Sequence, residues 1–455
     1  MKNNLLACVL IGLLLNIGVQ VSIAQNRSSL NPEQITALKN VRNDLSDHLT
    51  KELIPFWTKN SIDKKYGGYF TCFDKDGQLY APDSSKYLNT QARLIWSFST
   101  FYKMYPENKS YLQAAKQGVD FFIDHFWDKK NAGWYWKVAR NGDFVDNGKV
   151  VYGQSFAIYA LTEYYMATGD QRGLDYAEKT FETLQKYAAD VARGGYYENL
   201  ENDWSLSAPG FCAGDRKSLD IHMHMMECYT NLYKATKDDV HKRRLEEVIL
   251  VLKSHMINKV TGCGMNQFDL NFNPIPAIAI RRTYNAEREG KLVETPTNTT
   301  SYGHNLELLW LMSWANQTME KPDTTDISIF RRLADHSLKY GLDYEFGGVY
   351  RDGPQDGPAL IKDKEFWQNA EAMVGYLEIY RITKDPKYLE AFNLVWKFVN
   401  TKMINHKVGE WTILLTREGK PIDPNVASVW KVSYHSGRAV IESINRIDRI
   451  LKEMK

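Results

Sequence analysis

The chain has 455 residues, of which 44% are hydrophobic and 25% are charged, and its formal net charge at pH 7 is +2. This composition is ordinary for a soluble globular protein, and the length allows one large domain or two to three smaller ones. The small, dispersed charge gives no electrostatic basis for binding nucleic acid or an anionic membrane, and without a dinucleotide fingerprint or phosphate loop we expect no cofactor.

The first 24 residues have the pattern of a secretory signal. Lys2 precedes an apolar run over residues 5–15, and Ser22-Ile23-Ala24 supplies small residues at the spacing of a cleavage site. A membrane anchor is the alternative, but the run is interrupted at Asn16 and is short for a bilayer span. We therefore expect residues 1–24 to be removed, the mature chain to contain no membrane span, and the protein to be exported to a bacterial periplasm.

Four cysteines remain after this cut: Cys72, Cys212, Cys228 and Cys263. Their spacing fits no zinc pattern. An oxidising compartment permits disulfides, but the sequence alone pairs none of them, and we expect free thiols.

The rest of the chain is predicted to be mostly helical. Apolar residues recur at helical spacing in five stretches, which are residues 94–105, 156–166, 222–235, 306–314 and 370–382. A short motif, glycine followed by aromatic or apolar residues, recurs between helices; its copies begin at Gly67, Gly133, Gly194, Gly262, Gly347 and Gly409. The intervals are mostly about 60 to 70 residues, a spacing that indicates a structural repeat.

Each interval has room for two helices, so the repeat indicates six helical hairpins. An open solenoid would need capping repeats, whereas a closed ring buries both ends of the array. Because no Ser-, Gly- or Pro-rich linker divides the chain, we predict an all-α fold, with one (α/α)6-barrel catalytic domain over residues 25–455. The interval from Gly264 to Gly348 is longer, and its added stretch is expected to be either a lid over the barrel mouth or a surface loop.

Two segments pair a histidine with acidic residues. Asp220, His224 and Glu227 lie at i, i+4 and i+7, on one face of a predicted helix, and a carboxylate beside an imidazole orients it and raises its basicity. His304 and Glu307 repeat the His-x-x-Glu spacing where another helix begins. Zinc motifs usually place two ligands four residues apart on one helix, so we expect no metal site.

Two further segments complete the candidate site. His435 lies near the C-terminus, in what would be the last hairpin. A ring brings the first and last hairpins together, so His435 can approach Arg93. The segment from Phe366 to Glu371 adds aromatic surface and polar groups.

Five segments then appear in one order: Gln91-Ala92-Arg93, Lys217-Ser218-Leu219-Asp220-Ile221-His222-Met223-His224, Tyr302-Gly303-His304-Asn305-Leu306-Glu307, Phe366-Trp367-Gln368-Asn369-Ala370-Glu371 and Tyr434-His435-Ser436-Gly437-Arg438. Through most of the mature chain this set resembles the N-acylglucosamine 2-epimerase superfamily, and within it the cellobiose and mannobiose 2-epimerases most closely. The resemblance implies an (α/α)6 barrel and a carbohydrate epimerase or isomerase acting on a small sugar. We expect a monomer or a homodimer.

The resemblance also implies residue roles. His304 and His435 match the two catalytic histidines, and His224 belongs with them in the expected catalytic set. The residues expected to bind or polarise the sugar are Arg93, Asp220, Glu307, Trp367, Glu371 and Trp430. In the family one histidine removes the C2 proton of a ring-opened reducing-end sugar, giving an enediolate, and another returns a proton to the opposite face.

The sequence departs from the family at several of these positions. Asp220 replaces an Asn, Asn305 replaces an Asp, and Phe366 replaces a Trp. We expect Asp220 to raise the pKa of His224. These changes leave open the sugar, of glucose or mannose type or a disaccharide such as cellobiose or mannobiose, and the choice between epimerisation and aldose–ketose isomerisation.

Two alternatives remain. A glycoside or unsaturated-uronyl hydrolase on the same barrel would need a pair of carboxylates, which Asp220, Glu307 and Glu371 offer. A non-catalytic carbohydrate-binding relative would keep the fold without the chemistry.

Overall fold

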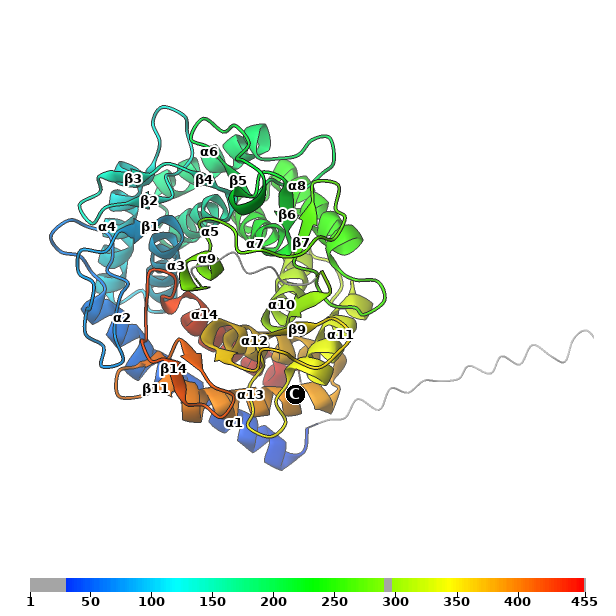
Figure 1. The fold of residues 1–455 in the computed structure, drawn as a ribbon. Helices are drawn as coiled ribbons and strands as arrows, with labels where there is room; N and C mark the ends of the chain where they lie inside the picture. The colour runs from blue at the N-terminus through cyan, green and yellow to red at the C-terminus, as the bar shows by residue number, and fades with distance from the viewer. Residues whose placement is uncertain (1–29, 290–296, 454–455) are drawn as a thin grey trace, which may run out of the picture.

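A computed structural model describes residues 30–289 and 297–453 of the chain (Figure 1). The expected export signal, residues 1–24, lies outside the described residues. Within those residues, no helix is both long and apolar enough to cross a membrane. The four cysteines of the expected mature chain are free thiols.

Helices form a closed inner ring. Its members are α3 (Leu88–Met104), α5 (Val151–Thr168), α7 (Leu219–Thr236), α10 (Tyr302–Thr318), α12 (Phe366–Thr383) and α14 (Ser433–Lys452). Each packs against the next in chain order, and α14 packs against α3, so the ring closes (Figure 1).

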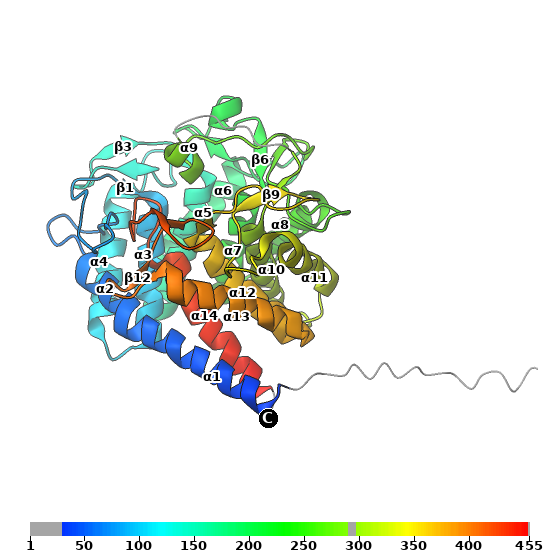
Figure 2. The same ribbon diagram turned by 60° about the horizontal axis from the view of Figure 1, so that its bottom comes forward.

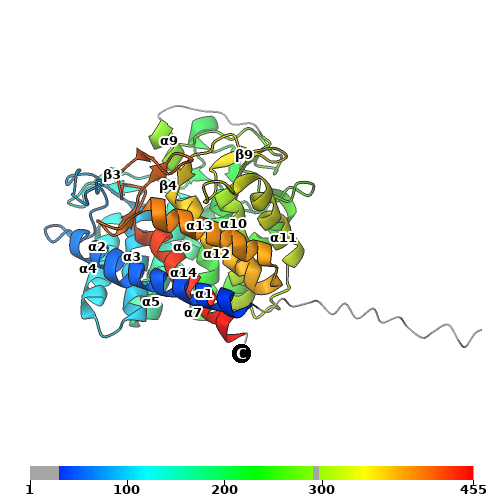
Figure 3. The ribbon, with the colours of Figure 1, turned by 90° about the horizontal axis from the view of Figure 1, so that it is seen from below.

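A second layer of helices lies outside this ring: α1 (Pro32–Asp47), α4 (Lys109–Phe126), α6 (Gln171–Tyr187), α8 (Asp239–Val251), α11 (Ile327–His336) and α13 (Pro386–Phe398). Helix α1 packs against α14, which places the first and last helices side by side (Figures 2 and 3). The alternation of outer and inner helices confirms the predicted helical barrel. Short helical segments extend or follow some outer helices: η1 (His48–Leu53), α2 (Ile54–Asn60), η3 (Leu252–Met256), η4 (Ser337–Gly341) and η5 (Val399–Met403).

The five stretches predicted from apolar spacing lie within five of the inner helices, which extend further toward their N-termini. Helix α3 begins at Leu88, before the stretch that starts at residue 94, and α10 begins at Tyr302, close to the start predicted at His304. The first turns carry polar residues that are buried at the end of the ring, such as Asn89 and Asn305. Their polarity interrupts the apolar period, which explains why the apolar stretches begin later than the helices.

Among the described residues, five short antiparallel strand pairs place a strand directly before an inner helix, and three further pairs lie between helices. The pairs are β1 (Lys86–Tyr87) with β2 (Lys137–Val138), β2 with β3 (Phe144–Asp146), β4 (Lys149–Val150) with β5 (Asn199–Leu200), β6 (Arg216–Ser218) with β7 (Gln267–Asp269), β8 (Thr299–Ser301) with β9 (Asp352–Pro354), β10 (Lys364–Glu365) with β13 (Leu414–Leu415), β13 with β14 (Pro421–Asp423), and β11 (Ile404–Asn405) with β12 (Glu410–Trp411). In the first pair Lys86 lies opposite Val138.

Buried ion pairs fix the glycine turns at this end of the ring. In four repeats the lysine of the strand before the inner helix contacts an aspartate that precedes the glycines: Lys86 with Asp63 at 3.2 Å, Lys149 with Asp128 at 2.9 Å, Lys217 with Asp190 at 2.9 Å and Lys364 with Asp343 at 2.8 Å. Each lysine ammonium is thereby paired where it would otherwise be a costly buried charge.

A polar side chain from each following helix then holds the turn. His222 Nε2 accepts a hydrogen bond from the Tyr196 N–H at 2.9 Å, and Asn305 Oδ1 accepts from the Gly264 N–H at 2.7 Å. Gly195 adopts φ +74°, and a Cβ there would lie 2.5 Å from His222 Nε2, so only glycine fits. His222 and Asn305 therefore support the fold.

Candidate active site

A cavity of about 330 Å³ opens at the end of the ring where the inner helices begin. The candidate residues that line it are Arg93, Asp220, His224, His304, Glu307, Trp367, Trp430 and His435. Glu371 lies behind His435 instead of among the described residues that line the cavity. Because several inner helices begin here, their positive N-terminal ends favour negative charge in the cavity.

His435 is held by a buried carboxylate. Its Nδ1 lies 2.7 Å from Glu371 Oε1, and Glu371 also accepts hydrogen bonds from Arg438 and from the Trp310 indole, both at 2.8 Å. Burial raises the pKa of Glu371, but Arg438 and His435 outweigh this effect and lower it to about 2. The ionised carboxylate requires a proton on Nδ1 of His435, which leaves Nε2 as the nitrogen that can act in the cavity.

The neutral form of His435 is favoured. Burial lowers its pKa to about 3, and the nearby guanidinium groups of Arg93 and Arg438 act in the same direction, while Glu371 opposes them. A neutral imidazole with an unprotonated nitrogen is the form that a general base needs.

His304 approaches the same space from α10. Its ring centroid lies 4.6 Å from that of Trp367, which in turn lies 6.0 Å from that of His435. Burial lowers the pKa of His304, and Asp220, whose Oδ1 is 3.6 Å from Nε2, opposes this shift. Trp367 therefore contacts both histidines, and each histidine has its own acidic neighbour: Asp220 beside His304 and Glu371 beside His435.

His224 has a carboxylate at each nitrogen. Nδ1 lies 2.8 Å from Glu227 Oε2, and Nε2 lies 3.3 Å from Asp220 Oδ1. Burial lowers the pKa of His224, but these two carboxylates outweigh burial and raise it to about 10, the direction expected for Asp220. A protonated ring with both nitrogens engaged has no lone pair for accepting a proton, so the geometry makes His224 a fixed cation.

Arg438 is not among the described residues that line the cavity, but it connects acidic side chains of three inner helices. Its buried guanidinium donates to Glu307 at 2.7 Å and to Glu371 at 2.8 Å, and it also contacts Glu227 and Tyr434. These acidic partners compensate the buried charge. Arg438 closes the Tyr-His-x-x-Arg segment, but sequence spacing does not show that three acidic side chains meet there.

Glu307 keeps one oxygen for the cavity. Oε1 binds Arg438, whereas Oε2 is buried and has no hydrogen-bond partner among the described residues. Burial, together with the charge of Glu371, raises the pKa of Glu307 to about 8. The group is thus suited to exchange hydrogen bonds with a sugar hydroxyl.

Arg93 is fixed between two parts of the barrel. It donates to the Trp430 carbonyl at 3.2 Å and to the Tyr152 hydroxyl at 2.6 Å, and its guanidinium carbon lies 4.3 Å from the centroid of Phe156. Its Nε is buried and has no hydrogen-bond partner in the described part of the chain. Tyr152 also lines the cavity, and no sequence signal identified it.

The long insertion covers the cavity, as one of the two expectations for it proposed. Ala277, Ile280 and Thr283 are among its residues that line the cavity, and α9 (Tyr284–Glu289) follows them. Arg282 anchors the insertion through hydrogen bonds of 2.8 and 3.0 Å to Asp146 at the end of β3. The insertion is therefore part of the wall of the site.

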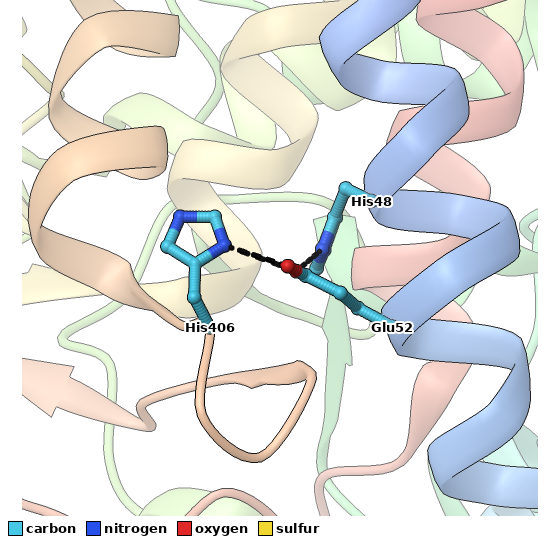
Figure 4. A group of neighbouring side chains, drawn as sticks. All are labelled: His48, Glu52 and His406. Carbon is cyan, nitrogen blue, oxygen red and sulfur yellow. Dashed lines mark hydrogen bonds and ion pairs between the residues drawn. The ribbon is translucent and has the colours of Figure 1, made fainter.

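Two clusters of described residues have metal-like ligand sets, and neither fits a metal ion. The first cluster consists of Glu307, Glu371 and His435, and its two carboxylates already bind the Arg438 guanidinium, a cation in its own right. In the second, His48 and His406 flank Glu52 (Figure 4).

The second cluster cannot bind a metal ion because the His48 nitrogen that faces Glu52 carries a hydrogen. The Trp411 indole N–H donates to His48 Nε2 at 2.9 Å, so the hydrogen of the neutral ring must reside on Nδ1, which faces Glu52 at 2.7 Å. The lone pair that a metal needs is therefore absent from Nδ1.

Residues 68–439 match the family model described as N-acylglucosamine 2-epimerase (GlcNAc 2-epimerase). The chain belongs to this family. This confirms the resemblance drawn from the ordered segments, and it agrees with the closed ring of helices.

Relatives support the same assignment for this epimerase-family chain. The cellobiose 2-epimerase of Dictyoglomus turgidum is 28% identical over 427 residues, covering 90% of this chain and 100% of that protein. The D-mannose isomerase of Marinomonas mediterranea is 23% identical over 413 residues, covering 89% and 97%. The structure of cellobiose 2-epimerase from Spirochaeta thermophila superposes with a TM-score of 0.80 at 28% identity, covering 91% of this chain and 98% of the other. The expected class of enzyme, a sugar epimerase or isomerase, is confirmed.

Proposed function

We propose that the enzyme inverts C2 of a reducing-end sugar of glucose or mannose type, either free or at the end of a disaccharide. One observation carries the proposal: His435, held by Glu371 with Nε2 left to act, shares its cavity and its Trp367 wall with His304. Two imidazoles that share one cavity suit a reaction in which one group removes a proton and the other returns one.

In the first step, His435 Nε2 takes the C2 proton of the open-chain aldose. The electron pair of the broken C–H bond forms a C1–C2 double bond, and the carbonyl electrons move onto O1 to give an enediolate. Arg93 and the cationic His224 line the cavity and supply positive charge for the developing oxyanion. Glu371 stays ionised and stabilises the imidazolium formed at His435.

In the second step, His304 donates a proton to the opposite face of C2, and the carbonyl at C1 forms again. Burial lowers the pKa of His304, and Asp220 supports the acid role because its charge beside Nε2 opposes that shift. The two histidines exchange roles in the reverse reaction. Protonation at C1 in place of C2 would yield the ketose, so isomerisation is a branch of the same pathway.

The names of the relatives support the substrate class, since they are cellobiose 2-epimerases and a D-mannose isomerase. The apolar run and small residues of the first 24 positions support export of the enzyme to a periplasm.

A hydrolase is less well supported by the geometry. Glycoside hydrolysis needs two carboxyl groups that flank the scissile bond. Glu371 lies behind His435 and, with Glu307, binds Arg438. Asp220 and Glu307 do line the cavity, but each is already paired, Asp220 with His224 and His304, and Glu307 with Arg438.

The experiment is incubation with mannose, glucose, N-acetylglucosamine, cellobiose and mannobiose in deuterated water, followed by proton NMR. We expect deuterium at C2 together with the second epimer for at least one sugar. Cleavage of a disaccharide without C2 deuterium would indicate the hydrolase, and binding without any conversion would indicate a non-catalytic relative.

A further inference from the structure

The glycine turns place one side chain at a repeated position near the cavity. In each turn, one residue forms a β-bridge with a residue just past the outer helical segment, and the position meant is two residues further on: Glu198 after Tyr196, Asn266 after Gly264 and Arg351 after Val349. These three side chains line the cavity. At the same position of the first turn, Thr71 is buried and lies outside the set of described lining residues.

Glu198 is held rigidly at this position. Its carbonyl accepts a hydrogen bond from the Val151 N–H at 3.1 Å, where α5 begins. The residue is 4% exposed, and Ser218 donates to its carboxyl group from the start of α7. The other carboxyl oxygen, Oε1, is buried and has no hydrogen-bond partner among the described residues.

An unpartnered buried carboxyl oxygen destabilises a fold, so its presence at a cavity wall calls for a ligand. Burial, with Asp220 nearby, raises the pKa of Glu198 to about 8, so that the group is a neutral acid at pH 7. A neutral carboxyl group both donates and accepts hydrogen bonds, as a sugar hydroxyl does.

Three other cavity residues also carry buried polar atoms without partners among the described residues: Arg93 at Nε, Glu307 at Oε2 and Gln368 at Oε1. A ligand that meets such scattered donors and acceptors must itself carry many hydroxyl groups. Glu198 extends this set onto a glycine turn, whereas the other three lie on inner helices.

We propose that Glu198 is a further substrate-binding residue whose carboxyl group hydrogen-bonds a hydroxyl of the sugar and positions it between the two histidines. This inference rests on the proposed function. The inference goes beyond that function because it assigns a specificity-determining group to a glycine turn, outside the five ordered segments that carry the family resemblance.

The test compares Glu198→Ala and Glu198→Gln, with Thr71→Val as the control at the matched position outside the cavity. Each change is also placed in a His435→Asn background, so that binding of cellobiose and of mannose can be titrated without turnover. We expect Glu198→Ala to weaken binding of one of these sugars on the order of tenfold. Its thermal midpoint should equal or exceed that of the parent, because an unpartnered buried group is removed.

The conservative variant separates binding from folding. Glu198→Gln keeps a donor and an acceptor, so its affinity should stay within about threefold of the parent, and Thr71→Val should not change it. Unchanged affinity in Glu198→Ala would overturn the inference, as would a fall in thermal midpoint that accompanies the loss of binding in both Glu198 variants.

The two proposals fail separately. Absence of C2 deuterium with the unmodified enzyme would reject the epimerase mechanism. The titrations would still show whether Glu198 contributes to sugar binding. If C2 deuterium appears and Glu198→Ala binds like its parent, only the assignment of Glu198 is lost. If neither cellobiose nor mannose binds the parent, the inference is rejected.

Discussion

Two regions of this molecule place histidine against glutamate at the same distance. His435 lies 2.7 Å from Glu371 at the cavity, and His48 lies 2.7 Å from Glu52 where the N-terminal helical segment meets the last hairpin. In the second region His406 also contacts Glu52, at 3.0 Å (Figure 4). Both regions resemble metal or acid–base sites when only residue types and distances are considered.

The difference lies in the remaining nitrogens. His48 Nε2 accepts from the Trp411 indole, and His406 Nε2 contacts the carbonyl of Asn400 at 2.8 Å, so every ring nitrogen in that cluster is engaged. His435 has only Nδ1 engaged by Glu371, and its ring lines a cavity. The comparison teaches that a nitrogen left to face a cavity, more than a histidine beside a carboxylate, marks the reactive group.

The largest effect should come from His435→Asn. Asparagine cannot take the C2 proton, so kcat should fall on the order of 10⁴-fold, whereas sugar affinity should change little because the imidazole acts mainly in the transition state. Steady-state kinetics and calorimetric titration measure the two quantities. If the His435→Asn variant turned over at close to the rate of the unmodified enzyme, the claim that His435 is reactive and His48 is not would be wrong.

Glu371→Gln should have the next largest effect. The amide keeps the shape but loses the charge that holds the Nδ1 proton and stabilises the imidazolium, so we expect kcat to fall on the order of 10²-fold with KM little changed. The matched change at the other region, Glu52→Gln, should leave kcat unchanged. An equal loss in both variants would show that the charge acts on folding instead of on His435.

His224 sharpens the comparison, because it lines the cavity yet has both nitrogens engaged. Its pKa in the folded chain, about 10, lies above the ordinary value of 6.5. The carboxylates therefore stabilise the fold fully below pH 6.5, and that stabilisation is lost as pH rises through about 10.

Asp220→Asn tests this pH dependence. Because the Asp220 side chain is 41% exposed, we expect the variant to lose only about 1 kcal/mol of unfolding free energy at pH 7. That loss should shrink as pH approaches 10, as measured by urea unfolding at both pH values. A loss that is the same at both would mean that His224 is not the cation that Asp220 stabilises.

The smallest effect should come from His406→Ala. This side chain is 48% exposed, so removing its contact with Glu52 should cost at most about 1 kcal/mol and leave kcat/KM unchanged. Thermal unfolding measures the change in stability, and steady-state kinetics at one pH measure kcat/KM. A clear loss of turnover in this variant would assign the second cluster a part in the reaction.

The fold could be predicted from the sequence because its signals are local and repeated. The glycine motifs indicated the hairpins, and the apolar stretches located five inner helices, although the stretches begin after the polar first turns of those helices. Those turns are buried by the closure of the ring, as Asn305 shows in binding the Gly264 N–H. Contacts between distant segments are not encoded in local spacing.

The site was predicted in part for the same reason. The ordered segments pointed to Arg93, His304 and His435, which line one cavity in the structure. The sequence could not show which side chains reach the cavity surface. Glu371 was expected to bind the sugar, and it lies behind His435 instead. Glu198 directly follows the glycine motif that begins at Gly194, and that motif indicated only a structural repeat, so Glu198 was not identified as a site residue.

The central claim is that His304 and His435 act on opposite faces of C2, and deuterium transfer tests it most directly. His304→Asn and His435→Asn are each incubated in deuterated water with each of the two epimers separately, and the C2 position is followed by NMR. The account predicts that neither variant interconverts the epimers, and that each labels C2 of only one epimer, a different one for each variant. Epimerisation at the unmodified rate in either variant, or label in the same epimer for both, would contradict it.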